Sequence, residues 1–286
     1  MHPKNIEIEN PSKKNLDQPN SVSHVQVMGV INTTPDSFSD GGQFSTIDNA
    51  FKHALKMIDD GVDILDVGGE STRPGSDPVD LNQELARTIP LIKLIREVSD
   101  VPISIDTNKP DVMQQAVDAG ASIINSVWAL RLENSLELAA ELDVPVCFMH
   151  MQGTPETMQK NPIYNDVVSD VLDFLKRRID AAITAGIKPH NIIVDPGFGF
   201  GKTLQHNLQL LKSLAEFKSL NVPLLVGMSR KGMIGTILNK PVDQRLYGSV
   251  SSAVIAAMLG ADIVRVHDVP ETLDAIAMVN ALRQRN

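Results

Sequence analysis

Short apolar runs rich in Ile, Val and Leu alternate along the chain with longer stretches whose apolar residues recur every three or four positions. Such runs are typical of strands buried on both faces, and the longer stretches are typical of amphipathic helices. We predict strands over residues 25–31, 64–67, 103–105, 122–124, 144–148, 192–194, 224–226 and 263–266. We predict helices over residues 46–60, 81–98, 111–119, 136–142, 164–185, 204–214, 243–259 and 270–283.

Regular alternation of eight strands with eight helices favours parallel strands joined by right-handed crossovers. In a chain of 286 residues, the simplest arrangement is α/β: a single-domain (β/α)₈ TIM barrel, expected here over residues 23–286. An open doubly wound sheet is the alternative. Pro90 lies inside the second helix and is expected to kink it. Residues 1–22 are polar, lack the apolar segment of a signal peptide, and are expected to form a disordered or extended N-terminal segment.

Polar residues gather where the predicted strands end. In a barrel, the carboxyl ends of the strands form one rim, and active sites lie there. The residues at or just after these ends include Asn32, Asp66, Asp106, Asn125, Met149, Asp195, Ser229, Lys231, Arg265 and His267. The opposite ends follow plain connections such as Val101-Pro102 and Val222-Pro223. This asymmetry predicts a functional site at the carboxyl-end rim.

The sixth strand shows the pattern most clearly, in the sequence Ile-Ile-Val-Asp-Pro-Gly-Phe-Gly-Phe-Gly-Lys at 192–202. A buried strand ends at Asp195 and opens into a loop whose glycines allow tight turns and close approach to a ligand. The loop does not fit the nucleotide-binding P-loop, which needs four residues between its glycines. Only three separate Gly197 from Gly201.

The net charge of −9 argues against general attraction to nucleic acid or to an anionic membrane. An anionic substrate would therefore need local positive charge, which Arg73, Lys231, Arg265 and His267 supply at the predicted rim. The single cysteine, Cys147, excludes an internal disulfide framework and a cysteine zinc site. No stretch is long and apolar enough to span a bilayer. These features predict a cytoplasmic protein that binds small molecules.

The acids at the strand ends limit which metal ions and ligands the site can bind. Asp66, Asp106 and Asp195 have too few histidine neighbours for a zinc site. Asn32 and the hydroxyl-rich loop after it suit a hard cation such as Mg²⁺. Inward-facing Asp and Asn side chains suit a flat nitrogen heterocycle. An Asp at a strand end is also often a cap or a loop organiser, and this structural alternative stays open for Asp66 above all.

Five segments together resemble the dihydropteroate synthase family, at residues 32–42, 69–75, 195–202, 229–231 and 265–267. They occur in order and with the expected spacing from about residue 25 to the C-terminus. Family members are (β/α)₈ barrels of folate biosynthesis. They condense 6-hydroxymethyl-7,8-dihydropterin diphosphate with p-aminobenzoate, in the presence of Mg²⁺, to give 7,8-dihydropteroate and diphosphate. The resemblance implies a transferase that is typically a homodimer, and the Ala-rich face of the helix at 243–259 is a candidate interface.

The resemblance also implies roles for individual residues. The residue linked to Mg²⁺ and diphosphate would be Asn32. The diphosphate-binding group would be Thr72, Arg265 and His267. The pterin-binding set would be Asp106, Asn125, Asp195 and Lys231, with Met149 packing on the ring. The residues framing p-aminobenzoate would be Phe38, Arg73, Pro74, Phe198 and Ser229. Those expected to take part in catalysis are Asp106, Asp195, Lys231 and Arg265.

Two other functions stay open. One is a pterin-binding methyltransferase barrel acting on methyltetrahydrofolate, which the loop at 32–42 and the pair Arg265 and His267 argue against. The other is a catalytically silent pterin-binding paralogue, although every proposed ligand is present. Three residues depart from the common family pattern: Thr33, Ser126 and Gly232. For a synthase, loss of diphosphate would leave a pterin methyl cation that the ring nitrogens stabilise, so we expect an SN1-like displacement without a protein nucleophile.

Overall fold

The computed structural model describes residues 24–33, 43–71, 75–154 and 157–283. Its strands are β1 (Gln26–Asn32), β2 (Ile64–Gly68), β3 (Ile103–Asp106), β4 (Ile123–Ser126), β5 (Val146–Met149), β6 (Ile192–Asp195), β7 (Leu225–Val226) and β8 (Ile263–Val266). They form one parallel sheet in the order β6-β5-β4-β3-β2-β1-β8-β7. A parallel bridge between Val194 and Leu224 brings the two edges of this sheet together. The predicted (β/α)₈ barrel is therefore confirmed, and the open doubly wound sheet is excluded.

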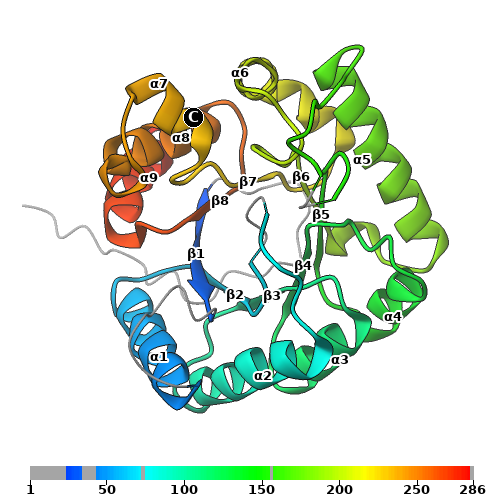
Figure 1. Cartoon of the computed structure of the whole chain (residues 1–286), viewed down its shortest axis with the longest axis vertical. Helices are drawn as coiled ribbons and strands as arrows, with labels where there is room; N and C mark the ends of the chain where they lie inside the picture. Colours follow the sequence, from blue (N-terminus) through cyan, green and yellow to red (C-terminus); the bar gives the residue numbers. More distant parts are fainter. Residues whose placement is uncertain (1–23, 34–42, 72–74, 155–156, 284–286) are drawn as a thin grey trace, which may run out of the picture.

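The helices surround the ring of strands (Figure 1). They are α1 (Gln43–Asp59), α2 (Leu81–Val98), α3 (Pro110–Asp118), α4 (Ser135–Leu142), α5 (Val167–Thr184), α6 (Leu204–Lys212), α7 (Gly232–Leu238), α8 (Leu246–Met258) and α9 (Val269–Arg283). Short 3₁₀ helices lie at Pro189–Asn191, Leu214–Leu220 and Val242–Gln244. α2 continues through Pro90 as one helix, and the kink expected there stays a prediction.

One α-helix of the described part of the chain was not predicted. α7 occupies the connection after β7 and begins directly after Lys231. It has only 7 residues and contains Gly232 and Gly235, so its intrinsic helical propensity is weak. The prediction of a single helix between β7 and β8 was therefore incomplete, and the missing helix lies next to the predicted site.

Apolar residues form two layers on the two sides of the strands. The larger layer packs the strands against the helices and includes the fully buried Ile31, Leu65 and Phe148. The smaller layer fills the inside of the barrel with Met28, Ile64, Ile123, Cys147, Ile193, Leu225 and Ile263. Cys147 is therefore a core residue, as its apolar sequence context indicated. We call this smaller layer the barrel floor.

The described helices do not include one that is both long and apolar enough to cross a bilayer. The N-terminal segment predicted over residues 1–22 lies outside the described residues, so that prediction stays open. The loop at 34–42, which follows Thr33, lies outside them as well.

Candidate active site

The predicted site residues stand one layer above the barrel floor. Successive side chains of a strand point to opposite faces, so a residue two positions further on faces the same side. Two positions beyond floor residues of their strands lie Asp66, Asn125, Met149, Asp195 and Arg265. On β3, Ser104 pairs with Asp66 and Asp106 follows two residues later. Strand alternation therefore brings these side chains together inside the carboxyl end of the barrel.

Arg265 connects the acids of this layer. Its Nε donates to Oδ2 of Asp66 at 2.6 Å, and its Nη2 donates to Oδ2 of Asp106 at 2.8 Å. Nδ2 of Asn125 lies 3.4 Å from both carboxylate oxygens of Asp66. Asp66 is fully buried, so it is positioned to orient Arg265 rather than to meet a ligand. Oδ1 of Asp106 is buried and has no hydrogen-bond partner among the described residues, which leaves one carboxylate oxygen for a ligand.

Lys231 joins the β7 and β6 loops. Its Nζ donates to the carbonyl oxygen of Phe198 and lies 4.6 Å from the centre of the Phe200 ring. Asp195, at the end of β6, accepts a hydrogen bond from the backbone N–H of Gly197 at 2.7 Å through Oδ1. The charges of Lys231 and Asp195 act on each other. A cation and an acid therefore face one another across the rim.

Burial dominates the electrostatics of the site. It raises the pKa of Asp106 to about 7, although Arg265 lowers it. It also raises the pKa of Asp195, against the opposing effect of Lys231. Burial lowers the pKa of Lys231 to about 8, and Asp195 partly offsets that effect. Burial alone would lower the pKa of Arg265, but the two acids bonded to it outweigh burial and raise that pKa. The site therefore holds groups that titrate close to neutral pH.

Ser229 and His267 meet beside Arg265. The backbone N–H of His267 donates to Oγ of Ser229 at 3.2 Å, and Nδ1 of His267 lies 3.1 Å from the same oxygen. Arg265 and His267 are two positions apart at the end of β8, so they face the same side. A guanidinium, an imidazole and a hydroxyl gathered in this way suit an anion such as a phosphate group.

Residues 28–267 match the family of pterin binding enzymes. The chain is 52% identical over 260 residues to the dihydropteroate synthase of Escherichia coli strain K12, with 91% of this chain and 92% of that protein covered. The chain belongs to the dihydropteroate synthase family. The resemblance seen in its five sequence segments is therefore confirmed, and so is its identification as a transferase of folate synthesis.

Two solved structures of Xanthomonas albilineans dihydropteroate synthase share the fold. The structure with 4-aminobenzoic acid is 46% identical, with a TM-score of 0.87, and covers 93% of this chain and 95% of its own. The structure in complex with 7,8-dihydropteroate is 43% identical, with a TM-score of 0.85, and covers 93% of this chain and 96% of its own. This likeness extends over the strand ends that carry the site described above.

One residue predicted from the dihydropteroate synthase family needs correction. The ring of Phe198 is 0% exposed and belongs to the main core between strands and helices. It therefore cannot frame p-aminobenzoate in this conformation, although its carbonyl oxygen holds Lys231. Phe200, two positions on, is only partly buried and packs against the Lys231 ammonium. The role expected for Phe198 therefore does not fit its buried position.

Other predicted residues differ in how far the structure places them. Met149 is buried, in a small cluster beside Phe200 at the rim, where it can pack on a flat ring. Residues outside the described part of the chain are Phe38, Thr72, Arg73 and Pro74. The roles that the family resemblance implies for these four stay predictions.

Two departures from the family pattern have local partners. Oγ1 of Thr33 donates to the carbonyl oxygen of Gly68 at 3.0 Å, which joins the end of β1 to that of β2. Oγ of Ser126 lies 3.2 Å from Oδ1 of Asn108 and accepts from the N–H of Leu130 at 3.2 Å. Ser126 therefore organises the turn after β4, and neither substitution removes a proposed ligand.

Asn32 is the described residue expected to be linked to Mg²⁺. It ends β1, is half-buried, and pairs with Gly68 of β2, close to Asp106. The described residues contain no group of three His, Cys, Asp or Glu side chains that would form a metal cage. Mg²⁺ is commonly held by one or two protein oxygens together with water and substrate phosphates. The amide oxygen of Asn32 fits such a site, in which water and substrate phosphates would supply most of the ligands.

Two buried charges below the rim were missed in the sequence. Lys202 ends the glycine-rich loop after β6 and is 3% exposed, and Glu84 on α2 is 0% exposed. Glu84 accepts hydrogen bonds from Thr107 Oγ1 at 2.6 Å and from Lys109 Nζ at 2.5 Å. Thr107 directly follows Asp106 in the chain. The lysine at the end of a glycine-rich loop could have been recognised in the sequence as a candidate buried charge. A glutamate in an ordinary helix gave no such signal.

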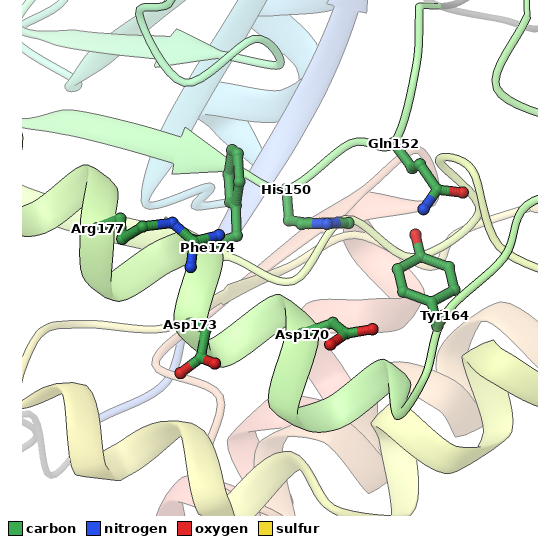
Figure 2. A pocket seen from close by; sticks show the side chains of 7 residues that line it. All are labelled: His150, Gln152, Tyr164, Asp170, Asp173, Phe174 and Arg177. Carbon is green, nitrogen blue, oxygen red and sulfur yellow. The ribbon is translucent and has the colours of Figure 1, made fainter.

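A separate cavity of 270 Å³ lies beside the rim, between the loop after β5 and the first turns of α5 (Figure 2). Its lining residues are His150, Gln152, Tyr164, Asp170, Asp173, Phe174 and Arg177. None of them belongs to the predicted site. His150 connects the two regions, because its Nδ1 lies 2.9 Å from the ammonium of the buried Lys202.

Proposed function

We propose that the chain joins 6-hydroxymethyl-7,8-dihydropterin diphosphate to p-aminobenzoate through a dissociative displacement that releases diphosphate. The reaction is that of the dihydropteroate synthase family. The displacement is supported above all by Arg265, which lies at once against two buried acids and beside the anion-binding pair of Ser229 and His267. One guanidinium thus links the proposed pterin pocket to the proposed diphosphate pocket.

The pterin pocket is formed by side chains from four strand ends. The free oxygen of Asp106 and the carboxylate of Asp195 accept hydrogen bonds from the N–H edge of the ring. Asn125 adds an amide, and the Lys231 ammonium donates to the ring carbonyl. As diphosphate leaves, positive charge grows on the pterin methyl carbon. The two carboxylates stabilise that charge because they are already fixed in a site of low polarity.

The diphosphate leaving group is an anion and requires positive charge around it. Arg265 and His267 hold the diphosphate, and Ser229 fixes the imidazole. Asn32 would hold Mg²⁺ here, and the ion would supply further neutralisation of the charge on the leaving group. Arg265 keeps its orientation throughout because Asp66 holds its Nε. No protein nucleophile is needed, because the arylamine of p-aminobenzoate attacks the carbocation.

The p-aminobenzoate site lies beside Ser229, and Phe200 takes the place first given to Phe198. Phe200 is the partly exposed aromatic ring of the β6 loop, next to Lys231. A solved Xanthomonas albilineans relative holds 4-aminobenzoic acid, and another holds 7,8-dihydropteroate. These two ligands correspond to one substrate and the product of the proposed reaction.

One assay tests the proposal. The purified chain is incubated with pterin diphosphate and p-aminobenzoate, with and without Mg²⁺, and 7,8-dihydropteroate is quantified by chromatography. We expect product only when both substrates are present, and much less of it when Mg²⁺ is removed. Binding of the pterin without product would identify a silent paralogue. Methyl transfer from methyltetrahydrofolate would identify a methyltransferase.

A homodimer is part of the proposal. Exposed apolar side chains gather on the last helices, with Tyr247, Ile255 and Met258 on α8 and Met278 and Leu282 on α9. α8 and α9 pack against each other (Figure 1), so these side chains belong to one part of the surface. A patch of this kind suits a second copy of the chain. Analytical ultracentrifugation of Met258→Lys against the unchanged chain tests it, and an unchanged mass would contradict this interface.

The chain is proposed to act in the cytoplasm. This location is consistent with a single buried cysteine and with substrates that are small soluble molecules. The proposal involves no nucleic acid and no membrane partner. Fractionation of cells that express a tagged full-length chain, followed by detection in the soluble and membrane fractions, tests it.

A further inference from the structure

Lys202 is a buried lysine with no acid in contact among the residues that the structure describes. It is 3% exposed, and its Nζ forms no salt bridge within 4 Å among the described residues. Instead, Nζ donates to the carbonyl oxygens of Gly197 at 2.9 Å and Phe200 at 3.1 Å, and it lies 2.9 Å from Nδ1 of His150. Burying an ammonium costs several kcal/mol unless its surroundings compensate. A lysine retained in such a place needs an explanation beyond packing.

The acceptors around Lys202 come from a loop with an unusual backbone. Gly197, Gly199 and Gly201 all have positive φ, at 70°, 81° and 62°. In this conformation the carbonyl groups of Gly197 and Phe200 point to Lys202 Nζ, whereas the carbonyl of Phe198 between them accepts from Lys231. A side chain at Gly197 would place Cβ only 1.9 Å from the carbonyl oxygen of His150. The loop after β6 therefore lies directly on the loop after β5, and Lys202 binds both.

Gly197 links this buried cation to the proposed pterin ligand. Its N–H donates to Oδ1 of Asp195 at 2.7 Å, while its C=O accepts from Lys202. The same ammonium holds the carbonyl of Phe200, whose ring packs against Lys231. Lys202 thus contacts the backbone groups that orient the acid and the aromatic ring of the site, without reaching the site itself.

We propose that Lys202 is a positioning residue, which fixes the β6 loop so that Asp195 presents its carboxyl group to the pterin ring. The inference rests on the proposed function, because it takes Asp195 to be a pterin ligand. Lys202 touches neither substrate. It acts through Gly197, because it binds the C=O of this residue while Asp195 accepts from the N–H of the same residue.

The charges around these groups agree with that role. Asp195 faces Lys202 in its own loop, Lys231 after β7 and Arg265 on β8, and all three lower its pKa while burial raises it. Burial lowers the pKa of Lys202 well below its ordinary value, Asp195 opposes that effect and Lys231 adds to it, and the imidazole of His150 lies 2.9 Å from Nζ. Burial, with Lys202 and Arg131 adding to it, lowers the pKa of His150 to about 2. That imidazole is therefore neutral and accepts from Lys202.

The test compares Lys202→Met and Lys202→Gln with the exposed Lys212→Met as the control. The first variant removes charge and donors, whereas the second keeps an amide donor without charge. Binding of 6-hydroxymethylpterin is measured by calorimetry from pH 5.5 to pH 8.5, and unfolding is followed for each variant. We expect Lys202→Met to lose about tenfold or more in affinity at pH 7, as for a lost hydrogen bond to a charged group. The loss of affinity at low pH that belongs to Asp195, measured in the Asp106→Asn background, moves to higher pH because Asp195 loses one neighbouring positive charge.

A double-mutant cycle with Asp195→Asn separates positioning from general stability. If Lys202 acts through Asp195, Lys202→Met weakens pterin binding much less in the Asp195→Asn background than in the unchanged chain. Equal losses in both backgrounds would overturn the proposal, as would no shift in the loss of affinity at low pH that belongs to Asp195. If neither Lys202 variant folds while Lys212→Met does, Lys202 serves stability alone and the proposal also fails. An unchanged chain that does not bind pterin would instead refute the proposed function.

Discussion

Arg265 donates from Nη2 to Oδ2 of Asp106 at 2.8 Å, so the cation proposed for diphosphate is bonded to an acid proposed for the pterin. The two halves of the site are therefore coupled by one hydrogen bond. When diphosphate leaves, Arg265 is still compensated by Asp106 and Asp66. The pair provides charge at both ends of the breaking bond without rearrangement, which is the condition for electrostatic stabilisation of a transition state.

Arg265→Lys should weaken binding of the pterin diphosphate more than binding of 6-hydroxymethylpterin. Lysine keeps a positive charge but loses the planar fork that reaches Asp66, Asp106 and a phosphate together. We expect roughly a tenfold to hundredfold loss for the diphosphate ligand, the scale of a hydrogen bond to a charged group. Calorimetry with the two ligands measures the difference. Equal losses for both ligands would contradict a role for Arg265 at the diphosphate.

Pterin affinity should pass through a maximum between about pH 7 and about pH 8. Burial raises the pKa of Asp106 to about 7, so its carboxylate forms as the pH rises through that value. Burial lowers the pKa of Lys231 to about 8, so its ammonium is lost as the pH rises further. Asp106→Asn should remove the part of the acid limb near pH 7 and leave the part that belongs to Asp195, and Lys231→Arg should remove the alkaline limb that belongs to the protein. The titration of the ligand itself is measured separately. A flat profile for the unchanged chain would refute both assignments.

The raised pKa of Asp106 also has a consequence for folding. The folded chain keeps the Asp106 proton over a pH range in which the unfolded chain has already lost it. The stability that Asp106 contributes is therefore complete below the ordinary Asp pKa, and it is lost as the pH rises through about 7. Denaturant unfolding from pH 4 to pH 8 should show a smaller decline for Asp106→Asn than for the unchanged chain. Parallel curves would contradict the raised pKa.

Much of this site could be predicted because strand ends determine it. A short apolar run followed by Asp106 or Asp195 is visible in the sequence, and a parallel barrel brings all such ends to one rim. The faces of loop residues could not be predicted in the same way. The backbone between Asp195 and Lys202 turns through three residues with positive φ, so strand alternation no longer tells whether Phe198 or Phe200 points to the core.

Contacts between distant segments were also beyond the sequence. Glu84 lies in α2 among residues of ordinary helical spacing, and only the fold brings Thr107 and Lys109 against it. The sequence left open whether Asp66 is a structural residue, and only the structure shows the hydrogen bond that it accepts from Arg265. α7 was missed because a 7-residue helix with two glycines depends on tertiary contacts rather than on propensity.

Glu84→Gln should move the acid limb of pterin binding to lower pH. The negative charge of Glu84 raises the pKa of Asp106, and glutamine removes that charge while keeping the shape. The variant should also lose about 1–3 kcal/mol of unfolding free energy, because its buried hydrogen bonds to Thr107 and Lys109 are weakened. Calorimetry and denaturant unfolding measure the two effects. The exposed Glu137→Gln is the control, and an acid limb identical in both variants would exclude this coupling.

Gly197→Ala should damage the site far more than a change at another glycine with positive φ. Gly61 has a φ of 90° and open space around its Cβ position, whereas Gly197 has a φ of 70° and a Cβ position 1.9 Å from the carbonyl oxygen of His150. Gly61→Ala thus carries only the backbone cost of a left-handed conformation, about 1–2 kcal/mol. Gly197→Ala carries that cost and must also separate the β6 loop from the β5 loop, which moves the N–H and the C=O of residue 197 that Asp195 and Lys202 bind.

Unfolding and pterin binding should therefore respond differently in the two variants. Gly61→Ala should lower the unfolding free energy and leave pterin affinity unchanged, because Gly61 precedes β2 at the end of the barrel opposite the rim. Gly197→Ala should lower both, and its pterin affinity should stay low at temperatures where the chain is still folded. If Gly197→Ala keeps full affinity, the contact between the β5 and β6 loops does not orient Asp195, and the pterin must depend on other strand ends.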